Sequence, residues 1–305
     1  MVLDYLQQLY FYVYLDRKEK NMTIQENLEL GVKNLKKENI SEPILKSRLL
    51  LCYVLNLKKE DLFIYSDKEL NSKDEKKYKE VIQKLIEGYP IQYITHYQEF
   101  MKLDFYVDEN VLIPRADTEI TVEEVISYCK NMKRDNIRIL DLCTGSGIIA
   151  ISIGNYIKNC EIVAVDISSK ALEISKSNAN RNKVGNITWV LSNLFERVEG
   201  KFDIIVSNPP YIKKEVISTL EKEVQKEPII ALDGGKDGFK FYREIIKKAP
   251  NYLKKEGAIF LEIGYDQRQE VLDIINETKE YNKVISKKDL SGNDRMIMAK
   301  YQKEW

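Results

Sequence analysis

The sequence predicts an α/β fold with a Rossmann-like, mostly parallel sheet, preceded by a small N-terminal helical domain. After Asn136, short apolar strands alternate with amphipathic helical segments, which is typical of a parallel sheet covered by helices on both faces. A glycine-rich turn at 141–147 follows the first of these strands, and the tetrapeptide 208–211 follows the fourth. Because ligands bind at the carboxyl ends of such strands, these two motifs mark the expected functional site.

The composition is that of a globular protein with about two domains. The 305 residues include 48 Lys or Arg and 48 Asp or Glu, so the formal charge is zero. This balance argues against a broad electrostatic surface for nucleic acid. The four cysteines lack zinc-ligand spacing and His96 is the only histidine, so we expect no metal and no histidine-based mechanism. Without a disulfide framework, the expected location is the cytoplasm.

Residues 1–22 are expected to be an atypical N-terminal extension. Its apolar part, 1–15, is too short to span a bilayer and lacks a small-residue cleavage site. Three interpretations remain open: Met22 is the true start, the extension packs onto the helical domain, or it lies as a helix on a membrane surface.

Residues 23–90 are expected to form a helical domain of three helices. Ser41 is the expected cap of the second helix and Asn71 that of the third, while Gly88 and Pro90 end the third. A domain that recognises a protein substrate and a scaffold that only stabilises are both open interpretations. The expected buried positions are Ile24, Leu28, Val32 and Leu35, then Ile44, Leu45, Leu49 and Leu55, then Tyr78, Val81, Ile82 and Leu85.

Residues 91–113 are expected to form short strands, a β-hairpin linker in which Phe105 and Val107 alternate with polar neighbours. Residues 114–305 are expected to form the α/β domain. Its tail lacks an intervening helix, so we expect a terminal antiparallel hairpin at the sheet edge. The expected strands are 137–142, 162–166, 187–191, 202–207 and 258–263, followed by the tail strands 281–286 and 296–301, and 169–181 is an expected helix.

The glycine-rich turn is compatible with two cofactors, NAD and S-adenosylmethionine. Gly145, Gly147 and Ala150 satisfy the dinucleotide pattern G-x-G-x-x-A, and Asp166 falls at the distance expected for a ribose-binding carboxylate, so NAD is a competitor. S-adenosylmethionine is favoured because its cationic sulfonium tolerates a carboxylate such as Asp141. The terminal hairpin also departs from an all-parallel dinucleotide sheet.

In the S-adenosylmethionine interpretation, Asp166 accepts hydrogen bonds from both ribose hydroxyls, because a carboxylate offers two acceptor oxygens. Asn193 follows the third strand, where the adenine amino group should fall, and Leu194 would lie against the adenine ring. The alternatives are a helix cap for Asp166 and an ordinary loop for Asn193.

The tetrapeptide Asn208-Pro209-Pro210-Tyr211 is expected to hold an –NH2 group for methylation. Proline lacks an N–H and a second proline keeps it extended, so Pro209 presents a rigid carbonyl. The Asn208 side chain offers a second acceptor, and two acceptors at a fixed angle bind both hydrogens of a planar amide. Tyr211 adds an aromatic face. Taken alone, the motif is also compatible with a polar turn that closes a strand.

With these residues in view, the chain resembles the HemK/PrmC family of protein-glutamine N5-methyltransferases, which modify the Gly-Gly-Gln loop of peptide chain release factors. The resemblance implies a class I methyltransferase fold, S-adenosylmethionine as donor and a release factor as protein substrate. It covers nearly all of 23–301. The motifs that carry it are 90–94, 99–100, 111–115, 141–147, 208–211, 227–228, 231–235, 237–238 and 293–295.

Applied residue by residue, the resemblance also implies which residues contact the methyl donor and which contact the protein substrate. Arg115 and Glu119 would border the entrance for the release-factor loop. Three departures from the family pattern are His96 in place of glycine, Ala116-Asp117-Thr118-Glu119 in place of Pro-Glu-Thr-Glu, and Asn193 in place of an acid, which should weaken donor binding. The expected donor contacts are Asp141, Cys143, Thr144, Gly145, Ser146, Gly147, Asp166, Asn193, Leu194 and Asn208, and the expected glutamine contacts are Asn208, Pro209, Pro210 and Tyr211.

Asn208, Pro209 and Tyr211 are the expected catalytic residues, and no strong base is expected to act before methyl transfer. The alternatives are methylation of a ribosomal protein's glutamine, DNA adenine-N6 methylation, which needs base flipping, and a catalytically idle binding module. We expect a monomer that binds neither a membrane nor, stably, nucleic acid.

Overall fold

The computed structural model describes residues 21–132 and 135–302, which divide into two compact units between Thr95 and His96. Apart from its last two positions, the expected extension 1–22 lies outside the described residues. Each unit has its own apolar core. None of the described helices combines the length and the apolar composition that crossing a membrane requires.

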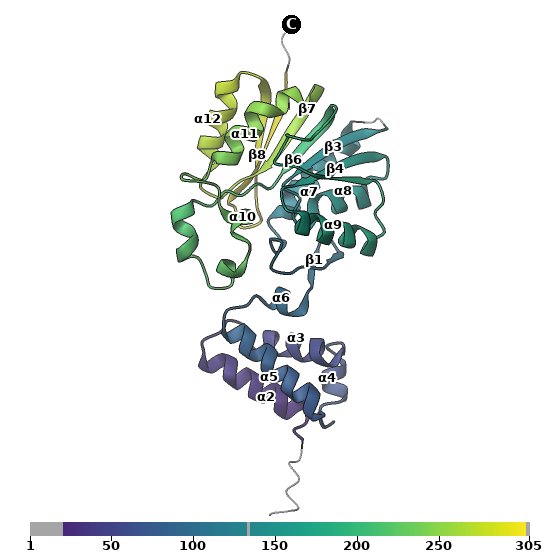
Figure 1. Cartoon of the computed structure of the whole chain (residues 1–305), viewed down its shortest axis with the longest axis vertical. Coiled ribbons are helices and arrows are strands. Elements are labelled where there is room, and N and C mark those ends of the chain that lie inside the picture. Colours follow the sequence, from purple (N-terminus) through teal and green to yellow (C-terminus); the bar gives the residue numbers. More distant parts are fainter. Residues whose placement is uncertain (1–20, 133–134, 303–305) are drawn as a thin grey trace, which may run out of the picture. The chain divides into compact units, whose positions relative to one another are not determined.

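The first unit is a set of helices around one core (Figure 1). Thr23 caps the first helix with a capping box: its hydroxyl accepts from the Glu26 N–H, and the Glu26 carboxylate accepts from the Thr23 N–H. Asn71 caps the third long helix as expected, accepting from the Asp74 N–H at 2.9 Å. The helices of this unit are α2 (Ile24–Lys37), α3 (Pro43–Leu55), α4 (Asp61–Ile64), α5 (Ser72–Ile86) and α6 (Ile91–Thr95).

The expected cap of α3 and two of its four expected buried residues are wrong, whereas Leu55 packs against the core as expected. The helix begins at Pro43, a residue preset for the first helical position, so Ser41 lies too early to cap it. Ile44 and Leu45 are exposed. Because α3 is apolar on most sides, its pattern does not fix which face is buried. The core instead takes in Ser47, whose hydroxyl lies 2.6 Å from the Tyr78 hydroxyl.

The segment 91–113 begins with helix α6 rather than with the expected strand. The antiparallel hairpin of β1 (Gln98–Phe100) and β2 (Leu103–Phe105) follows, and it belongs to the second unit. Phe100 and Phe105 pack edge to face in the core with ring centroids 6.2 Å apart. His96 adopts a left-handed φ of 54°, which suits the glycine of the family pattern, and its ring stacks on Tyr106.

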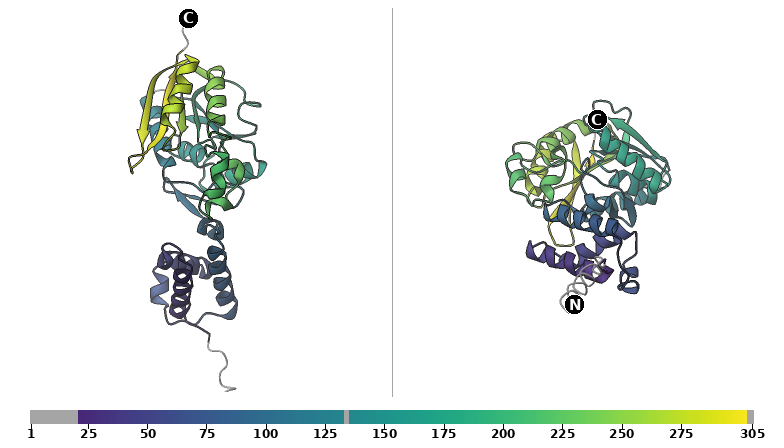
Figure 2. Two further views of the ribbon diagram at one scale, coloured as in Figure 1. Left: turned by 90° about the vertical axis from the view of Figure 1, so that its left-hand side faces the viewer. Right: turned by 60° about the horizontal axis from the view of Figure 1, so that its bottom comes forward.

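In the second unit, the described residues form a seven-stranded sheet in the order β5-β4-β3-β6-β7-β9-β8. The first five strands in this order are parallel, and β9 and β8 add an antiparallel pair, as expected. Figure 2 shows β8 and β9 as the yellow strands at one margin of the unit. The strands are β3 (Ile137–Leu142), β4 (Cys160–Asp166), β5 (Ile187–Leu191), β6 (Phe202–Ser207), β7 (Leu253–Glu262), β8 (Tyr281–Lys288) and β9 (Asp294–Tyr301).

Helices cover both faces of this sheet (Figure 1). Successive strand residues point to opposite faces, so each strand packs against both sets of helices. Ile139 and Ile204 pack under one set of helices, whereas their neighbours Leu140 and Ile205 pack under the other. The first set is α7 (Thr118–Asn131), α8 (Ile148–Tyr156) and α9 (Ser169–Arg181), and the second is α11 (Lys240–Lys248) and α12 (Arg268–Thr278), with the 3-10 turn η3 (Ala249–Asn251) after α11.

Between β6 and α11 the chain makes a closed loop, residues 212–235. Ile212 and Asp233 form a parallel β-bridge. The Gly234 N–H donates to the Ile212 carbonyl at 2.8 Å, and the Lys214 N–H donates to the Gly235 carbonyl at 3.0 Å. The two ends of the loop are therefore bonded to each other. The loop contains η1 (Lys214–Thr219), η2 (Val224–Lys226) and α10 (Ile229–Leu232).

Candidate functional site

A cavity of about 300 Å³ lies at the carboxyl ends of β3, β4, β5 and β6. This is the place where a doubly wound sheet reverses its strand order, since β3 pairs with β4 on one side and with β6 on the other. The expected site residues that line it are Cys143, Gly145, Asp166, Asn193, Leu194, Asn208 and Pro210.

Four residues of the glycine-rich turn, Asp141, Thr144, Ser146 and Gly147, are not among the lining residues. Asp141 is fully buried, and one of its oxygens accepts from the Thr144 hydroxyl at 2.6 Å and from the Ala150 N–H at 3.2 Å. Burial raises the pKa of Asp141 to about 7. This carboxyl group therefore shapes the turn from behind instead of facing the cavity.

Gly147 begins α8 with a left-handed φ of 87°, and a Cβ there would lie 2.1 Å from the Ser175 hydroxyl oxygen. Only glycine fits this position. Gly145 also has a left-handed φ, of 55°, but a Cβ on it would meet no atom within 4 Å. It borders the cavity, so its missing side chain leaves space for a ligand close to the backbone.

Asp166 ends β4 and faces the cavity. One of its oxygens accepts from the Gly145 N–H at 2.8 Å and the other from the Ser168 N–H at 2.9 Å. Burial raises its pKa, and these backbone hydrogen bonds oppose the rise. A carboxylate has about four lone-pair sites, so two remain for a diol.

The far wall of the cavity follows β5. The Asn193 amide donates to the Glu196 carboxylate at 2.8 Å, which leaves the Asn193 oxygen as an acceptor. The sequence did not single out most of the apolar wall, because its residues come from several separate strands, helices and loops that only the fold brings together. They are Val111, Leu112, Val165, Ile167, Ala171, Pro228, Ile230, Ala231 and Phe241, with Asn110, Ser168, Ser192 and Lys240 as polar additions.

The tetrapeptide leaves β6 beside this cavity. Asn208 and Pro210 line it, whereas Pro209 is buried and Tyr211 packs against the core under α11. No described residue donates a hydrogen bond to the Pro209 carbonyl. The Tyr211 carbonyl accepts from the Gln267 amide at 3.0 Å, and burial raises the pKa of the Tyr211 phenol, which stays neutral.

Arg115 and Glu119 do not line the cavity. Arg115 forms an ion pair with the buried Glu227, whose second oxygen accepts from the Ile113 N–H at 3.0 Å. Glu119 accepts from the Met101 N–H at 2.8 Å. Both residues therefore brace loops next to the site.

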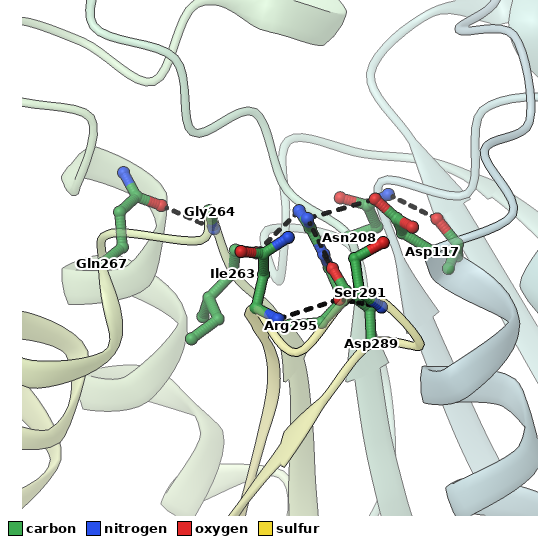
Figure 3. Close-up of polar contacts among 10 residues, drawn as sticks. Asp117, Asn208, Ile263, Gly264, Gln267, Asp289, Ser291 and Arg295 are labelled. Carbon is green, nitrogen blue, oxygen red and sulfur yellow. Dashed lines mark hydrogen bonds and ion pairs between the residues drawn. The ribbon is translucent and has the colours of Figure 1, made fainter.

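Behind Asn208, charged side chains gather around Arg295, which the sequence indicated only as part of motif 293–295 (Figure 3). Arg295 contacts Asp117 at 3.1 Å and Asp289 at 3.0 Å. The Asn208 side-chain nitrogen donates to the Thr118 hydroxyl at 3.4 Å. The charged group thus reaches the tetrapeptide through the start of α7.

Comparison with known proteins identifies the family. Residues 26–95 match the PrmC N-terminal domain and residues 126–227 match the methyltransferase small domain. A release factor glutamine methyltransferase of Clostridium botulinum is 42% identical over 92% of this chain and 99% of the relative. The chain belongs to the release factor glutamine methyltransferase family. A relative of the same name from Fusobacterium nucleatum is 38% identical over 92% of this chain and 81% of its own.

Among solved structures, the hMettl16 catalytic domain in complex with the MAT2A 3′UTR hairpin 6 matches with a TM-score of 0.54. At 16% identity over 70% of this chain and 80% of that one, it shares the fold alone. Family and fold together make the protein a methyltransferase whose methyl donor is S-adenosylmethionine.

Proposed function

We propose that this protein transfers a methyl group from S-adenosylmethionine to the side-chain amide nitrogen of the glutamine in the Gly-Gly-Gln motif of peptide chain release factors. The observation that carries the proposal is the exit of β6, where Asn208 borders the donor cavity and the Pro209 carbonyl accepts no hydrogen bond from a described residue. Relatives named release factor glutamine methyltransferase support the choice of substrate.

The cavity has groups that suit S-adenosylmethionine. Asp166 would hold the ribose hydroxyls with its two remaining lone-pair sites, and Asn193 would accept from the adenine amino group while Leu194 packs on the ring. The open backbone at Cys143 and Gly145 would carry the methionine part. Asp141, Thr144, Ser146 and Gly147 would act indirectly, by holding the shape of the turn.

Bound S-adenosylmethionine would supply a methyl carbon on a sulfonium: as the amide nitrogen forms the new N–C bond, the S–C bond would break, the thioether S-adenosylhomocysteine would leave, and the nitrogen would lose one proton to solvent. An amide nitrogen is a poor nucleophile because its lone pair is delocalised into the carbonyl. In the proposal, the Asn208 oxygen and the Pro209 carbonyl accept the two amide hydrogens and fix the direction of the lone pair. The same two oxygens stabilise the positive charge that develops on nitrogen. Pro210 would flank the amide, whereas Tyr211, which packs against the core, would support the tetrapeptide from behind.

We assign substrate recognition to the helical domain, 23–90, and methyl transfer to 114–305, with 91–113 joining them. The helical unit exposes apolar side chains that suit a protein partner. The partly exposed Arg115 guanidinium would border the entrance for the release-factor loop, while Glu119 braces it. We further propose a cytoplasmic monomer without stable nucleic-acid binding, in line with its zero formal charge. Among the described residues of the helical domain, the exposed large apolar side chains are Ile44, Leu45, Phe63, Ile64, Tyr65 and Tyr89.

Mass spectrometry of a release factor incubated with the protein and S-adenosylmethionine tests the proposal. We expect a gain of about 14 Da, one CH2, on the Gly-Gly-Gln peptide. A release factor with alanine in place of that glutamine is the matched control and should gain nothing. Methyl transfer to a ribosomal protein or to duplex DNA instead would overturn the assignment.

A further inference from the structure

Asn208 and Glu262 are neighbours across two paired strands. In the parallel pairing of β6 with β7, Ser207 lies opposite Leu261, and Asn208 and Glu262 are the residues that follow them along the two strands. Side chains at paired positions of parallel strands point to the same side of the sheet. Glu262 is 1% exposed, so the residue beside the substrate-binding amide is a buried acid.

Glu262 lacks part of the hydrogen bonding that usually compensates a carboxylate for the loss of water on burial. Its Oε2 atom is buried and has no hydrogen-bond partner among the described residues. Burial raises its pKa to about 7, while hydrogen bonding with Thr118, the charge of Arg295 and hydrogen bonding with Asn208 lower it. The charged or titratable groups that interact electrostatically with Glu262 are Arg295, Asp117, Tyr211 and Tyr242. Asp289 acts on Glu262 indirectly, through its ion pair with Arg295.

The chemistry of these groups fixes which of them donates each hydrogen bond. An ionised carboxylate only accepts hydrogen bonds, so in the hydrogen bond between Thr118 and Glu262 the hydroxyl is the donor. The lone pairs of that hydroxyl then face the Asn208 side-chain nitrogen, which donates to it at 3.4 Å. With its NH2 group on this side, Asn208 turns its oxygen the other way.

We propose that Glu262 and Thr118 are positioning residues that hold the Asn208 amide with its oxygen toward the acceptor glutamine. This inference rests on the proposed function. Without the carboxylate, Thr118 is free to donate to the Asn208 oxygen, and the amide turns over. The Asn208 NH2 group would then face the glutamine NH2 group, donor against donor, and the glutamine nitrogen would lose one of its two acceptors.

Two isosteric variants on one helix test the inference. Thr118 and Thr121 are both fully buried in α7, but the Thr121 hydroxyl has no hydrogen-bond partner among the described residues. Thr118→Val should lower kcat about 10- to 100-fold, and Thr118→Ser, which keeps the hydroxyl, should restore most of it. Thr121→Val should leave kcat near that of the wild type. Donor affinity, measured by calorimetry, should stay the same in all three variants.

The pH profile separates positioning from packing. If Glu262 must be ionised, kcat of the wild type falls as the pH drops through about 7. Glu262→Gln should have a lower kcat that depends less on pH in this range, since the pKa of Asp141 is also about 7. A readout without substrate is the Asn208 side-chain NH2 signal in NMR spectra, identified by its loss in Asn208→Asp. It should shift over the same pH range in the wild type and stay constant in Glu262→Gln.

Equal losses of kcat in Thr118→Val and Thr121→Val would overturn the inference, as would a failure of Thr118→Ser to recover activity. An Asn208 NH2 signal that titrates in Glu262→Gln as it does in the wild type would also overturn it. A wild-type protein that does not methylate the release factor would sink the proposed function instead, and the NMR titration would then still decide the orientation of Asn208.

Discussion

Two regions lie next to each other at one edge of the sheet: the cavity that would hold the methyl donor, and the residues around Asn208 that would hold the acceptor glutamine. We refer to them as the donor side and the acceptor side, and they are built differently. The donor side uses a continuous turn, backbone N–H groups and one carboxylate, Asp166, against apolar walls. The acceptor side joins side chains from separate segments, Asn208, Thr118, Glu262 and Arg295, through buried polar contacts. The polar groups of the cavity thus come largely from the turn and the strand end beside it, whereas the contacts around Asn208 join segments that only the folded sheet brings together.

Asn208→Ala should give the largest effect on activity, and it should impair the alignment of the acceptor glutamine without impairing the binding of the methyl donor. Loss of a preorganised acceptor should lower kcat about 100- to 1000-fold, by analogy with the loss of one oxyanion-hole group. Donor affinity should stay within about twofold of the wild type by calorimetry, since Asp166 and the glycine turn remain intact. An equal loss of donor binding would mean that Asn208 serves the cofactor and not the acceptor.

Asp166→Asn should give the reverse pattern. The new NH2 group would oppose either the Gly145 N–H or the Ser168 N–H, and one ribose acceptor would be lost. We expect donor affinity to fall about 10- to 100-fold by calorimetry, as for a charged hydrogen bond. At saturating donor, kcat should change far less than in Asn208→Ala. Similar kcat losses in both variants would remove the distinction between the two sides.

Arg115→Ala should give the smallest of the three effects. It leaves Glu227 buried without its ion pair, and Glu227 precedes Pro228, which lines the cavity. We expect a loss of about 1–3 kcal/mol in unfolding free energy, measured with denaturant. The control is Arg243→Ala, which removes an exposed pair with Asp237 and should cost little. Equal losses would show that burial of Glu227 is unimportant.

The sequence predicted most of the sheet because apolar runs and turn residues are local signals. Helix 169–181 and strands 137–142, 187–191 and 202–207 are found at the expected residues. Ile44 and Leu45 of α3 were wrongly expected to be buried because apolar residues surround this helix, and contact with Tyr78 selects the buried side. Segment 91–95 was expected as strand, but it forms a short helix after Pro90.

For the site, the sequence pointed to the residues that follow each strand, and seven of them line the cavity. It did not separate Cys143 and Gly145, which face the cavity, from Asp141 and Thr144, which face inward, because this depends on the direction of each side chain. Glu262 was missed altogether. Its position carries no motif, and its importance comes from the pairing of β7 with β6.

The closed loop 212–235 has a consequence for how this enzyme could change over time. Since Ile212 and Asp233 are bridged to each other, insertions or deletions within the loop need not shift the register of β6 or α11. Ile230 and Ala231 of the same loop border the cavity, and Ile229 is exposed. A change in the length of this loop would therefore alter one wall of the cavity while the tetrapeptide at the end of β6 keeps its place.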